Sequence, residues 1–273
     1  MSSIDKTFVK KSFNAGADTY DRHAGLQNYM GEHLLKLVYA ESPALSRVLD
    51  VGMGTGNLTA RLMERFPLAC VHGCDIAINM LRRAWGKVPP SPGGRAFIAA
   101  DAESLPYKDR CFDLVASSFT YQWLEDWSRA LEEARRVLKP GGVFFFSAFG
   151  SHTFLELRQS YRQACLDTGY SLGQALELEG TEEKIAAGLA GCGFTAPLIN
   201  SFSIVEKYSS VNDLIKSIKG MGARNASTRR NKTPGVRKIW KRMVELYERD
   251  FRTQNTIPAT FEILMGKAKK PPR

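Results

Sequence analysis

The sequence has few of the residues that build metal sites and no long apolar segment. Its five cysteines and four histidines are scattered along 273 residues. Cys70 and Cys74 lie four positions apart, but no second pair completes a zinc site. The longest apolar run, Val143 to Phe149, is far shorter than the roughly 20 residues that a membrane span needs. We therefore expect a reduced, cytoplasmic protein with no metal ion and no membrane contact.

The first residues, MSSIDKTFVKK, have neither an apolar core nor a small-residue cleavage site, so no signal peptide is expected. One long stretch of the chain lacks acidic residues. From Lys216 to Arg242 the chain holds ten Lys or Arg and no Asp or Glu, which equals the formal net charge of +10. Such a surface suits nucleic acid, a membrane or an acidic protein. Trp240 is its only aromatic residue, so the stretch offers no evident base-stacking platform.

Short apolar runs alternate with segments of helical period over the first 150 residues. Residues 5–41 have helical character with a break near Ala24 and Gly25. Strands are expected at 47–51, 69–74, 96–100, 112–117 and 143–149, and helices at 58–66, 76–85 and 128–138, the last ended by the Lys-Pro-Gly-Gly of 139–142. Because the connections are short, the sheet should be parallel and doubly wound.

Beyond residue 150 this alternation stops. Helices are expected at 153–168 and 182–190, and strands at 197–207 and 256–267. These additions predict a doubly wound, seven-stranded, Rossmann-like α/β sheet with two helical insertions. We expect the insertions and the N-terminal helical segment to form a lid over the sheet.

The segment VLDVGMGTGNLT, residues 48–59, joins a predicted buried strand to a helix. Asp50 lies near the end of the strand, and three glycines follow at alternate positions: Gly52, Gly54 and Gly56. Glycine lets a backbone approach a ligand closely, and the helix N-terminus offers free N–H donors. A dinucleotide fingerprint requires a third glycine where Asn57 stands, which disfavours a nicotinamide cofactor.

Two further acids follow the next two predicted strands. Asp75 lies 19 residues beyond Gly56, where its carboxylate could accept both hydroxyls of a ribose, and Asp101 follows the third strand. A lone acid after a strand is often only a helix cap. The ordered set, completed by LKPGG before the fifth strand, resembles the class I S-adenosylmethionine-dependent methyltransferases.

This resemblance implies S-adenosylmethionine as the cofactor and an adenine contact for Asp101. The residues it implies in the cofactor site are Asp50, Gly52, Gly54, Gly56, Asp75, Ile76, Met80, Asp101, Ala102 and Ser117. Ile76 and Met80 could equally be plain core residues. The domain expected is a single one over 1–273. Its parts are an N-terminal helical lid (1–41), a cofactor-binding half (42–150), helical insertions (151–180 and 209–252) and a last strand (253–267).

Four other stretches narrow the resemblance. They are FNAGADTYDRHAGLQ (13–27), SFTYQWLEDW (118–127), HTFLELR (152–158) and LIKSIKGMGA (214–223). Together they resemble the malonyl-[acyl-carrier-protein] O-methyltransferases of biotin synthesis, from about Phe8 to Lys267. The Tyr-Asp segment is shared with trans-aconitate methyltransferases. The chain departs from the family at Ile218, where a leucine usually precedes the lysine.

The resemblance implies methylation of the free carboxylate of a malonyl thioester carried by acyl carrier protein. It suggests catalytic positions for Tyr20, Gln122 and Trp123, although lid or core packing would also explain Tyr20 and Trp123. The candidate ligands of the malonyl carboxylate are Arg158, Lys219 and Arg224, each of which could instead be a surface charge. The candidate residues for docking the acidic carrier are Arg229, Arg230, Lys232, Arg237 and Lys238.

Alternatives remain open at this point. A carboxyl methyltransferase of a free small acid, an RNA methyltransferase, or a cofactor-binding regulatory protein without turnover would share the glycine motif. We expect no nucleic-acid partner, and a monomer is the expected state.

Overall fold

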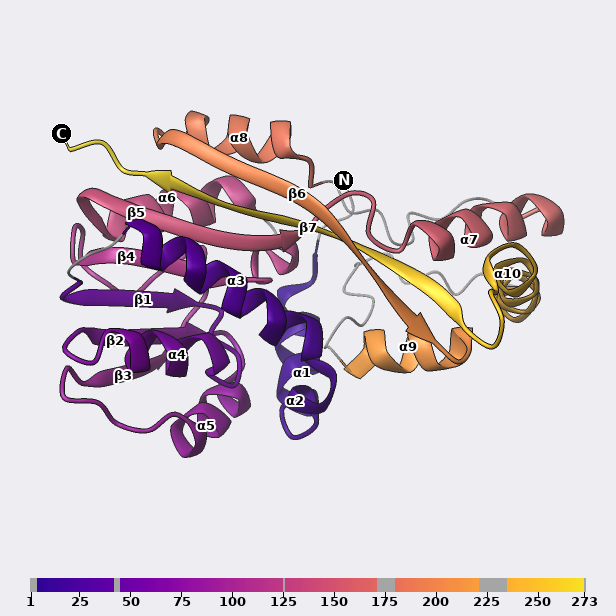
Figure 1. Ribbon diagram of the computed structural model, residues 1–273, viewed down its shortest axis with the longest axis horizontal. Helices are drawn as coiled ribbons and strands as arrows, with labels where there is room; N and C mark the ends of the chain where they lie inside the picture. The colour runs from indigo at the N-terminus through magenta and orange to yellow at the C-terminus, as the bar shows by residue number, and fades with distance from the viewer. Residues whose placement is uncertain (1–3, 42–44, 125, 171–179, 221–234, 273) are drawn as a thin grey trace.

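The computed structural model describes residues 4–41, 45–124, 126–170, 180–220 and 235–272 (Figure 1). The candidate residues Arg224, Arg229, Arg230 and Lys232 lie outside these ranges. Within the described ranges, none of the helices is both long and apolar enough to span a bilayer.

One sheet of seven strands organises the chain. The strands are β1 (Arg47–Val51), β2 (Cys70–Asp75), β3 (Arg95–Ala99), β4 (Phe112–Ser118), β5 (Leu138–Phe149), β6 (Thr195–Tyr208) and β7 (Ile257–Lys269). They lie in the order β3-β2-β1-β4-β5-β7-β6. The predicted doubly wound, seven-stranded architecture is confirmed. The reversal of strand order between β1 and β4 is the place where such sheets bind ligands.

The last strand differs from the simple alternation expected. The first five strands are parallel, whereas β7 runs antiparallel to both β5 and β6. Tyr208 at the end of β6 pairs with Ile257 at the start of β7. Because the chain re-enters the sheet at the end where β6 left it, β7 runs back along its neighbour.

The helix ends at Val137, close to the expected position, but the fifth strand begins at Leu138 and not at the expected residue 143. The backbone of Gly141 donates a hydrogen bond to the carbonyl of Lys270, and the amide of Lys270 donates to Gly142. The antiparallel partner thus extends β5 backwards through a glycine pair that otherwise favours a turn. This partner lies about 130 residues away in the sequence, so local sequence patterns could not predict the pairing.

Helices cover both faces of the sheet. They are α1 (Lys6–Gly16), α2 (Tyr20–His23), α3 (Gly25–Glu41), α4 (Asn57–Arg65), α5 (Ile78–Lys87), η1 (Tyr121–Trp123), α6 (Trp127–Val137), α7 (Leu155–Thr168), α8 (Glu182–Gly191), α9 (Val211–Gly220) and α10 (Val236–Phe251). The predicted break at Ala24 is confirmed between α2 and α3. One core cluster joins α3, α4 and α5 to the sheet, and a second joins α6 and α8 to its other face.

Side-chain caps explain where several helices begin. The Asp126 carboxylate accepts the amides of Ser128 and Arg129 at the start of α6, and the Thr181 hydroxyl accepts that of Lys184 at the start of α8. Each cap satisfies amides that have no partner within the helix.

The two insertion helices α7 and α10 pack together beyond the end of the sheet, where β6 and β7 protrude (Figure 1). Arg242 of α10 forms an ion pair with Asp167 of α7 at 2.6 Å, and the hydroxyl of buried Tyr247 donates to the Pro258 carbonyl. The buried Glu156 of α7 accepts the amide of Thr260 in β7 at 3.0 Å. These contacts attach both helices to the protruding strands.

The aromatic core beside α6 supplies a stability test. Phe144 of β5 is fully buried, and its ring contacts those of Tyr121, Phe146 and Phe194. We expect Phe144→Ala to lower the free energy of unfolding by about 3–5 kcal/mol, because it leaves a cavity. Phe202→Ala, at a position of β6 where the residue is 37% exposed, should cost about 1 kcal/mol or less. Urea denaturation measures both, and equal losses would contradict this core assignment.

Candidate functional site

The glycine loop after β1 turns sharply at the carboxyl end of the sheet. Gly52, Gly54 and Gly56 all have positive φ, at 72°, 54° and 84°. A Cβ at Gly52 would collide with the side chain of Thr120, and one at Gly56 with that of Val88, just after α5. Because side chains fit at neither position and disfavour this backbone region, the motif needs its glycines.

Asp50 lies beneath this loop. Its carboxylate is buried and accepts the hydroxyl of Thr59 at 2.6 Å. Burial raises the pKa of Asp50 to about 7, against the lowering effect of that hydrogen bond, and nearby Asp75 raises it further. Asp50 therefore anchors the start of α4 to β1.

Asp75 holds the loop from the neighbouring strand. One carboxylate oxygen accepts the amide of Gly54 at 2.9 Å, and the other accepts that of Ala77 at 2.8 Å. Burial raises the pKa of Asp75 to about 6, and the two amide hydrogen bonds limit the rise. Each carboxylate oxygen has a second lone pair, so Asp75 can also accept ligand hydroxyl groups.

Asp101 has a partner that sequence patterns did not indicate. Lys6 of α1 forms ion pairs with both Asp101 and Glu103 at 2.8 Å. The other Asp101 oxygen accepts the amide of Glu103. Lys6 thereby joins the N-terminal helix to the loop after β3, beside the position expected for an adenine ring.

The other predicted cofactor residues occupy different depths. Ser117 is wholly buried, and its hydroxyl donates to the Val51 carbonyl at 2.9 Å. The next residue, Ser118, lines a small recess against the glycine loop. Ala102 and Met80 are buried, and Ile76 is half-buried. Their roles toward a cofactor remain predictions.

An aromatic cluster covers the loop. Phe13 of α1 contacts the rings of Tyr20 and Trp123 edge-on, at centroid distances of 6.3 and 5.6 Å. The Tyr20 ring also lies over Gly54, within ordinary contact distance of a Cβ built there. Burial, and then the charge of Asp75, raise the pKa of Tyr20, so its phenol stays neutral. The structure therefore brings two of the three predicted catalytic residues together through Phe13.

Gln122, the third predicted catalytic residue, carries an unsatisfied acceptor. Its Oε1 atom is buried and has no hydrogen-bond partner among the described residues. A buried polar atom of this kind usually has a partner, so its lack of one here fits a ligand site.

Gln27 is a residue of the candidate site that the sequence-based predictions did not include. This residue of α3 lines the recess with Gly52, Gly54 and Ser118, and its buried Oε1 also lacks a partner within the described chain. The available signal was its place at the end of the stretch FNAGADTYDRHAGLQ (13–27), which also holds Tyr20.

Polar contacts fasten the N-terminal segment around the recess. Asp21 accepts the Thr55 hydroxyl at 2.6 Å and pairs with Lys87 at 2.8 Å. Asn14 accepts the amide of Asn79 at 2.9 Å. Residues of α1 and α2 therefore contact both the glycine loop and α5.

The predicted substrate and carrier residues are dispersed. Arg158 of α7 donates to the carbonyl of Ser151. Lys219 is exposed in the last turn of α9, whose Gly220 packs against the ring of His23. Arg237 and Lys238 are exposed in the first turn of α10. The structure does not bring these four residues into one cluster.

These features fit an S-adenosylmethionine site. The glycine turn lets the backbone approach a ligand closely, and acidic residues follow β2 and β3. The buried Oε1 atoms of Gln27 and Gln122 have no hydrogen-bond donor within the described residues. The described residues contain no group of three or more side chains that could hold a metal ion.

Comparisons with known proteins agree with this geometry. A family described as a methyltransferase domain matches residues 49–146. The chain is 37% identical to a malonyl-[acyl-carrier protein] O-methyltransferase of Geobacter sulfurreducens, covering 98% of this chain and 100% of that protein. It is 35% identical to one of Methylococcus capsulatus, covering 97% and 94%.

Solved structures share the fold at low identity. The YcgJ protein of Bacillus subtilis superposes with a TM-score of 0.61 at 18% identity, covering 88% of this chain and 99% of that one. A phosphoethanolamine N-methyltransferase of Haemonchus contortus, solved with S-adenosyl-L-methionine, has a TM-score of 0.58 at 19% identity, covering 94% and 57%.

The raised pKa of Asp75 gives cofactor binding a pH dependence. Above about pH 6 the carboxylate is ionised and accepts hydroxyl groups; below it, a proton occupies one acceptor position. We expect the affinity for S-adenosylhomocysteine, measured by calorimetry, to fall as the pH drops through 6. Asp75→Asn should weaken binding about tenfold at neutral pH and remove this dependence. Asp250→Asn, on α10, is the matched control. An unchanged pH profile in Asp75→Asn would refute this assignment.

Proposed function

This chain belongs to the malonyl-[acyl-carrier protein] O-methyltransferases, and on that premise we propose that it methylates the free carboxylate of a malonyl group carried by acyl carrier protein. The product is a methyl ester. Esterification hides a negative charge, and we place this step early in biotin synthesis, where the ester lets chain-elongating enzymes accept the malonyl group.

The observation that carries the proposal is the extent of the likeness. It runs through both insertions and the N-terminal segment, beyond the methyltransferase domain at 49–146. These outer segments supply α1, α2, α7, α9 and α10, none of which falls within residues 49–146. Substrate choice in methyltransferases of this fold has to come from such additions, because the cofactor half is common to many acceptors.

The methyl transfer needs little chemical assistance from the protein. S-adenosylmethionine supplies a methyl group already activated by its sulfonium. A carboxylate oxygen attacks that methyl carbon, the carbon–sulfur bond breaks, and its electron pair stays on sulfur, so no proton moves. The malonyl carboxyl is ionised at pH 7, so no general base is required. In-line positioning is the main task left to the residues.

We assign that positioning to Tyr20, Gln122 and Trp123. Tyr20 packs above the loop that faces the reacting end of the cofactor, and its neutral phenol presents no competing nucleophile. The unpartnered Oε1 of Gln122 supports a direct role toward a bound donor group. In this proposal α1 and α2, held across the recess by Asp21, form the lid that excludes water.

The malonyl carboxylate needs a cation beside this lid. Lys219 lies in the last turn of α9, and the adjoining Gly220 contacts His23 of α2. This contact places the end of α9 against the lid and makes Lys219 our preferred candidate, together with Arg224, which follows five residues later in the sequence and is outside the described residues. Arg158 is a weaker candidate because its guanidinium already donates to Ser151.

The carrier protein is proposed to dock on α10. Arg237, Lys238 and Lys241 line a surface groove together with Trp240, Val244 and Glu245. A lining of basic and apolar side chains suits an acidic helix, and complementary charge speeds such encounters. The predicted docking residues Arg229, Arg230 and Lys232 precede this helix in the chain.

Methyl acceptors separate this function from its alternatives. With tritiated methyl donor we expect label in malonyl-carrier protein, less in malonyl-coenzyme A, and none in trans-aconitate or bulk RNA. The reason is that only the carrier offers both the carboxylate and an acidic surface. Label found only in trans-aconitate or RNA would contradict the proposal and identify that molecule as the acceptor. No label in any acceptor would favour a regulatory protein that binds the cofactor without turnover.

Charge reversal on α10 tests the docking surface. The double substitution Arg237→Glu and Lys238→Glu should raise the KM for malonyl-carrier protein about tenfold at low salt, since it turns attraction into repulsion. The affinity for S-adenosylmethionine should not change. Lys36→Glu with Lys108→Glu, at exposed positions in α3 and in the loop before β4, is the control for net charge. Equal effects of the two pairs would exclude a local docking site.

A further inference from the structure

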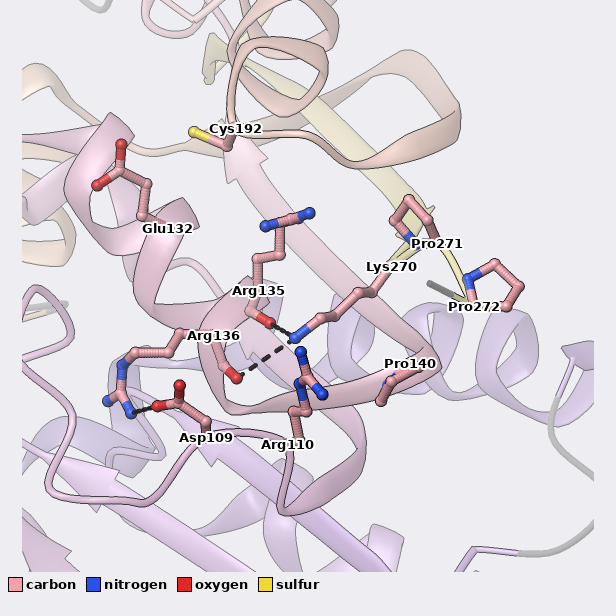
Figure 2. A pocket seen from close by; sticks show the side chains of 10 residues that line it. All are labelled: Asp109, Arg110, Glu132, Arg135, Arg136, Pro140, Cys192, Lys270, Pro271 and Pro272. Atoms are coloured by element: carbon pink, nitrogen blue, oxygen red, sulfur yellow. Dashed lines mark hydrogen bonds and ion pairs between the residues drawn. The ribbon is translucent and has the colours of Figure 1, made fainter.

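A second pocket lies at the end of the sheet opposite the glycine loop. It is formed where β4 begins, α6 ends and the chain leaves β7 (Figure 2). Its volume is about 560 Å³, within the range of small-molecule sites. The cofactor loop follows the carboxyl end of β1, whereas this pocket adjoins the amino ends of β4 and β5. The two sites are therefore separate.

The pocket carries unbalanced positive charge. Its lining includes four cations and two acids, a net charge of +2. The cations are Arg110, Arg135, Arg136 and Lys270, and the acids are Asp109 and Glu132.

Two of the cations already have partners. Arg136 pairs with Asp109 at 2.8 Å and with Glu133 at 2.6 Å. The Lys270 ammonium group donates to the carbonyls of Arg135 and Leu138, each at 2.7 Å. Lys270 thus caps the C-terminus of α6, where a cation is favoured by the helix dipole.

The other two cations keep free donors. Among the residues that the structure describes, none forms a hydrogen bond or ion pair with the Arg110 guanidinium. Arg135 uses only its Nε, which donates to the Gly193 carbonyl at 3.1 Å. Figure 2 shows these two guanidinium groups above and below the Lys270 ammonium group. Burial, and then the charges of Arg135 and Arg110, lower the pKa of Lys270, so the three cations repel one another.

The backbone of Arg110 is held in an unfavourable conformation. Its φ is 56°, in the left-handed region that non-glycine residues rarely adopt. The amides of Arg110 and Cys111 donate to the carbonyls of Arg136 and Val137 at 3.0 and 2.8 Å, which fixes this turn against α6. A strained position that carries an unpaired arginine into a pocket is characteristic of binding sites.

From this arrangement we propose that the pocket binds a small molecule through its phosphate group, with Arg110 and Arg135 as the ligands of the phosphate oxygens. A phosphate monoester carries a charge near −2 at neutral pH, which matches the net charge of the lining. Guanidinium groups donate in a fork that fits phosphate oxygens.

The remaining walls define the rest of the ligand. Pro140, Pro271 and Pro272 form a rigid side without backbone N–H donors, suited to contact with carbon atoms. Glu132 lies at the rim and points away from the arginines in Figure 2. The volume exceeds what a bare phosphate needs, so the site suits an organic phosphate.

Glycerol 3-phosphate is a direct probe of this site. Calorimetry at pH 7.5 should detect its binding to the full-length protein, with glycerol and sodium chloride at equal ionic strength as blanks. Arg110→Gly should weaken the affinity about tenfold or more, since it removes one charged hydrogen-bonding group. Glycine also suits the left-handed backbone, so this variant should fold at least as well as the parent, which its melting temperature checks.

Arg129→Gln, on the exposed face of the same helix as Arg135, is the matched control and should bind as the parent does. Arg135→Gln provides an independent second loss of affinity. The proposal is overturned if the parent binds glycerol 3-phosphate no better than the blanks, or if Arg110→Gly binds it unchanged. Methyl transfer is not read in this experiment, so the result stands apart from the proposed catalytic function.

Discussion

The carboxylate of Asp75 is the constraint on which the rest of the site depends. It accepts the amides of Gly54 and Ala77, so it joins the turn after β1 to the start of α5. The loop has three residues at positive φ, and the amides of Gly52 and Met53, which donate to the Cys74 carbonyl, hold its first part beside the contact of Asp75 with Gly54. Ala77 also contributes to the small cluster of Ala17 and Met80 on which Tyr20 packs. One buried acid therefore positions the loop and supports the segment that covers it.

The N-terminal cover combines contacts of two kinds. Its centre is aromatic, with Phe13 between Tyr20 and Trp123. Its edges are polar and mostly exposed, as in the pair of Lys87 and Asp21. Exposed pairs contribute little free energy each, so the apolar centre dominates the attachment while the polar edges set its orientation.

The two ends of the sheet have opposite electrostatic character. Acids follow the strands at the carboxyl end, where Asp75 and Asp101 lie beside the glycine loop. Cations gather at the amino ends of β4 and β5, where Arg110 and Lys270 meet the last turn of α6. This separation matches the proposed binding of a cationic cofactor at one end and of a phosphate group at the other.

The sequence by itself determined the elements and the cofactor motif, because both depend on local spacing. The glycines, Asp75 and the strand–helix alternation were all readable, and the fold followed from them. Tertiary structure alone decided the direction of β7, the pairing of Lys6 with Asp101 across 95 residues, and the meeting of Gln27 with the glycine loop. It also decided that Ser117 is buried and Ser118 faces the recess, since one residue of strand register exchanges the two sides. The periodicity of apolar residues indicates which face of a helix or strand is buried. It does not identify a contact partner far along the chain, because that contact forms only when the sheet assembles.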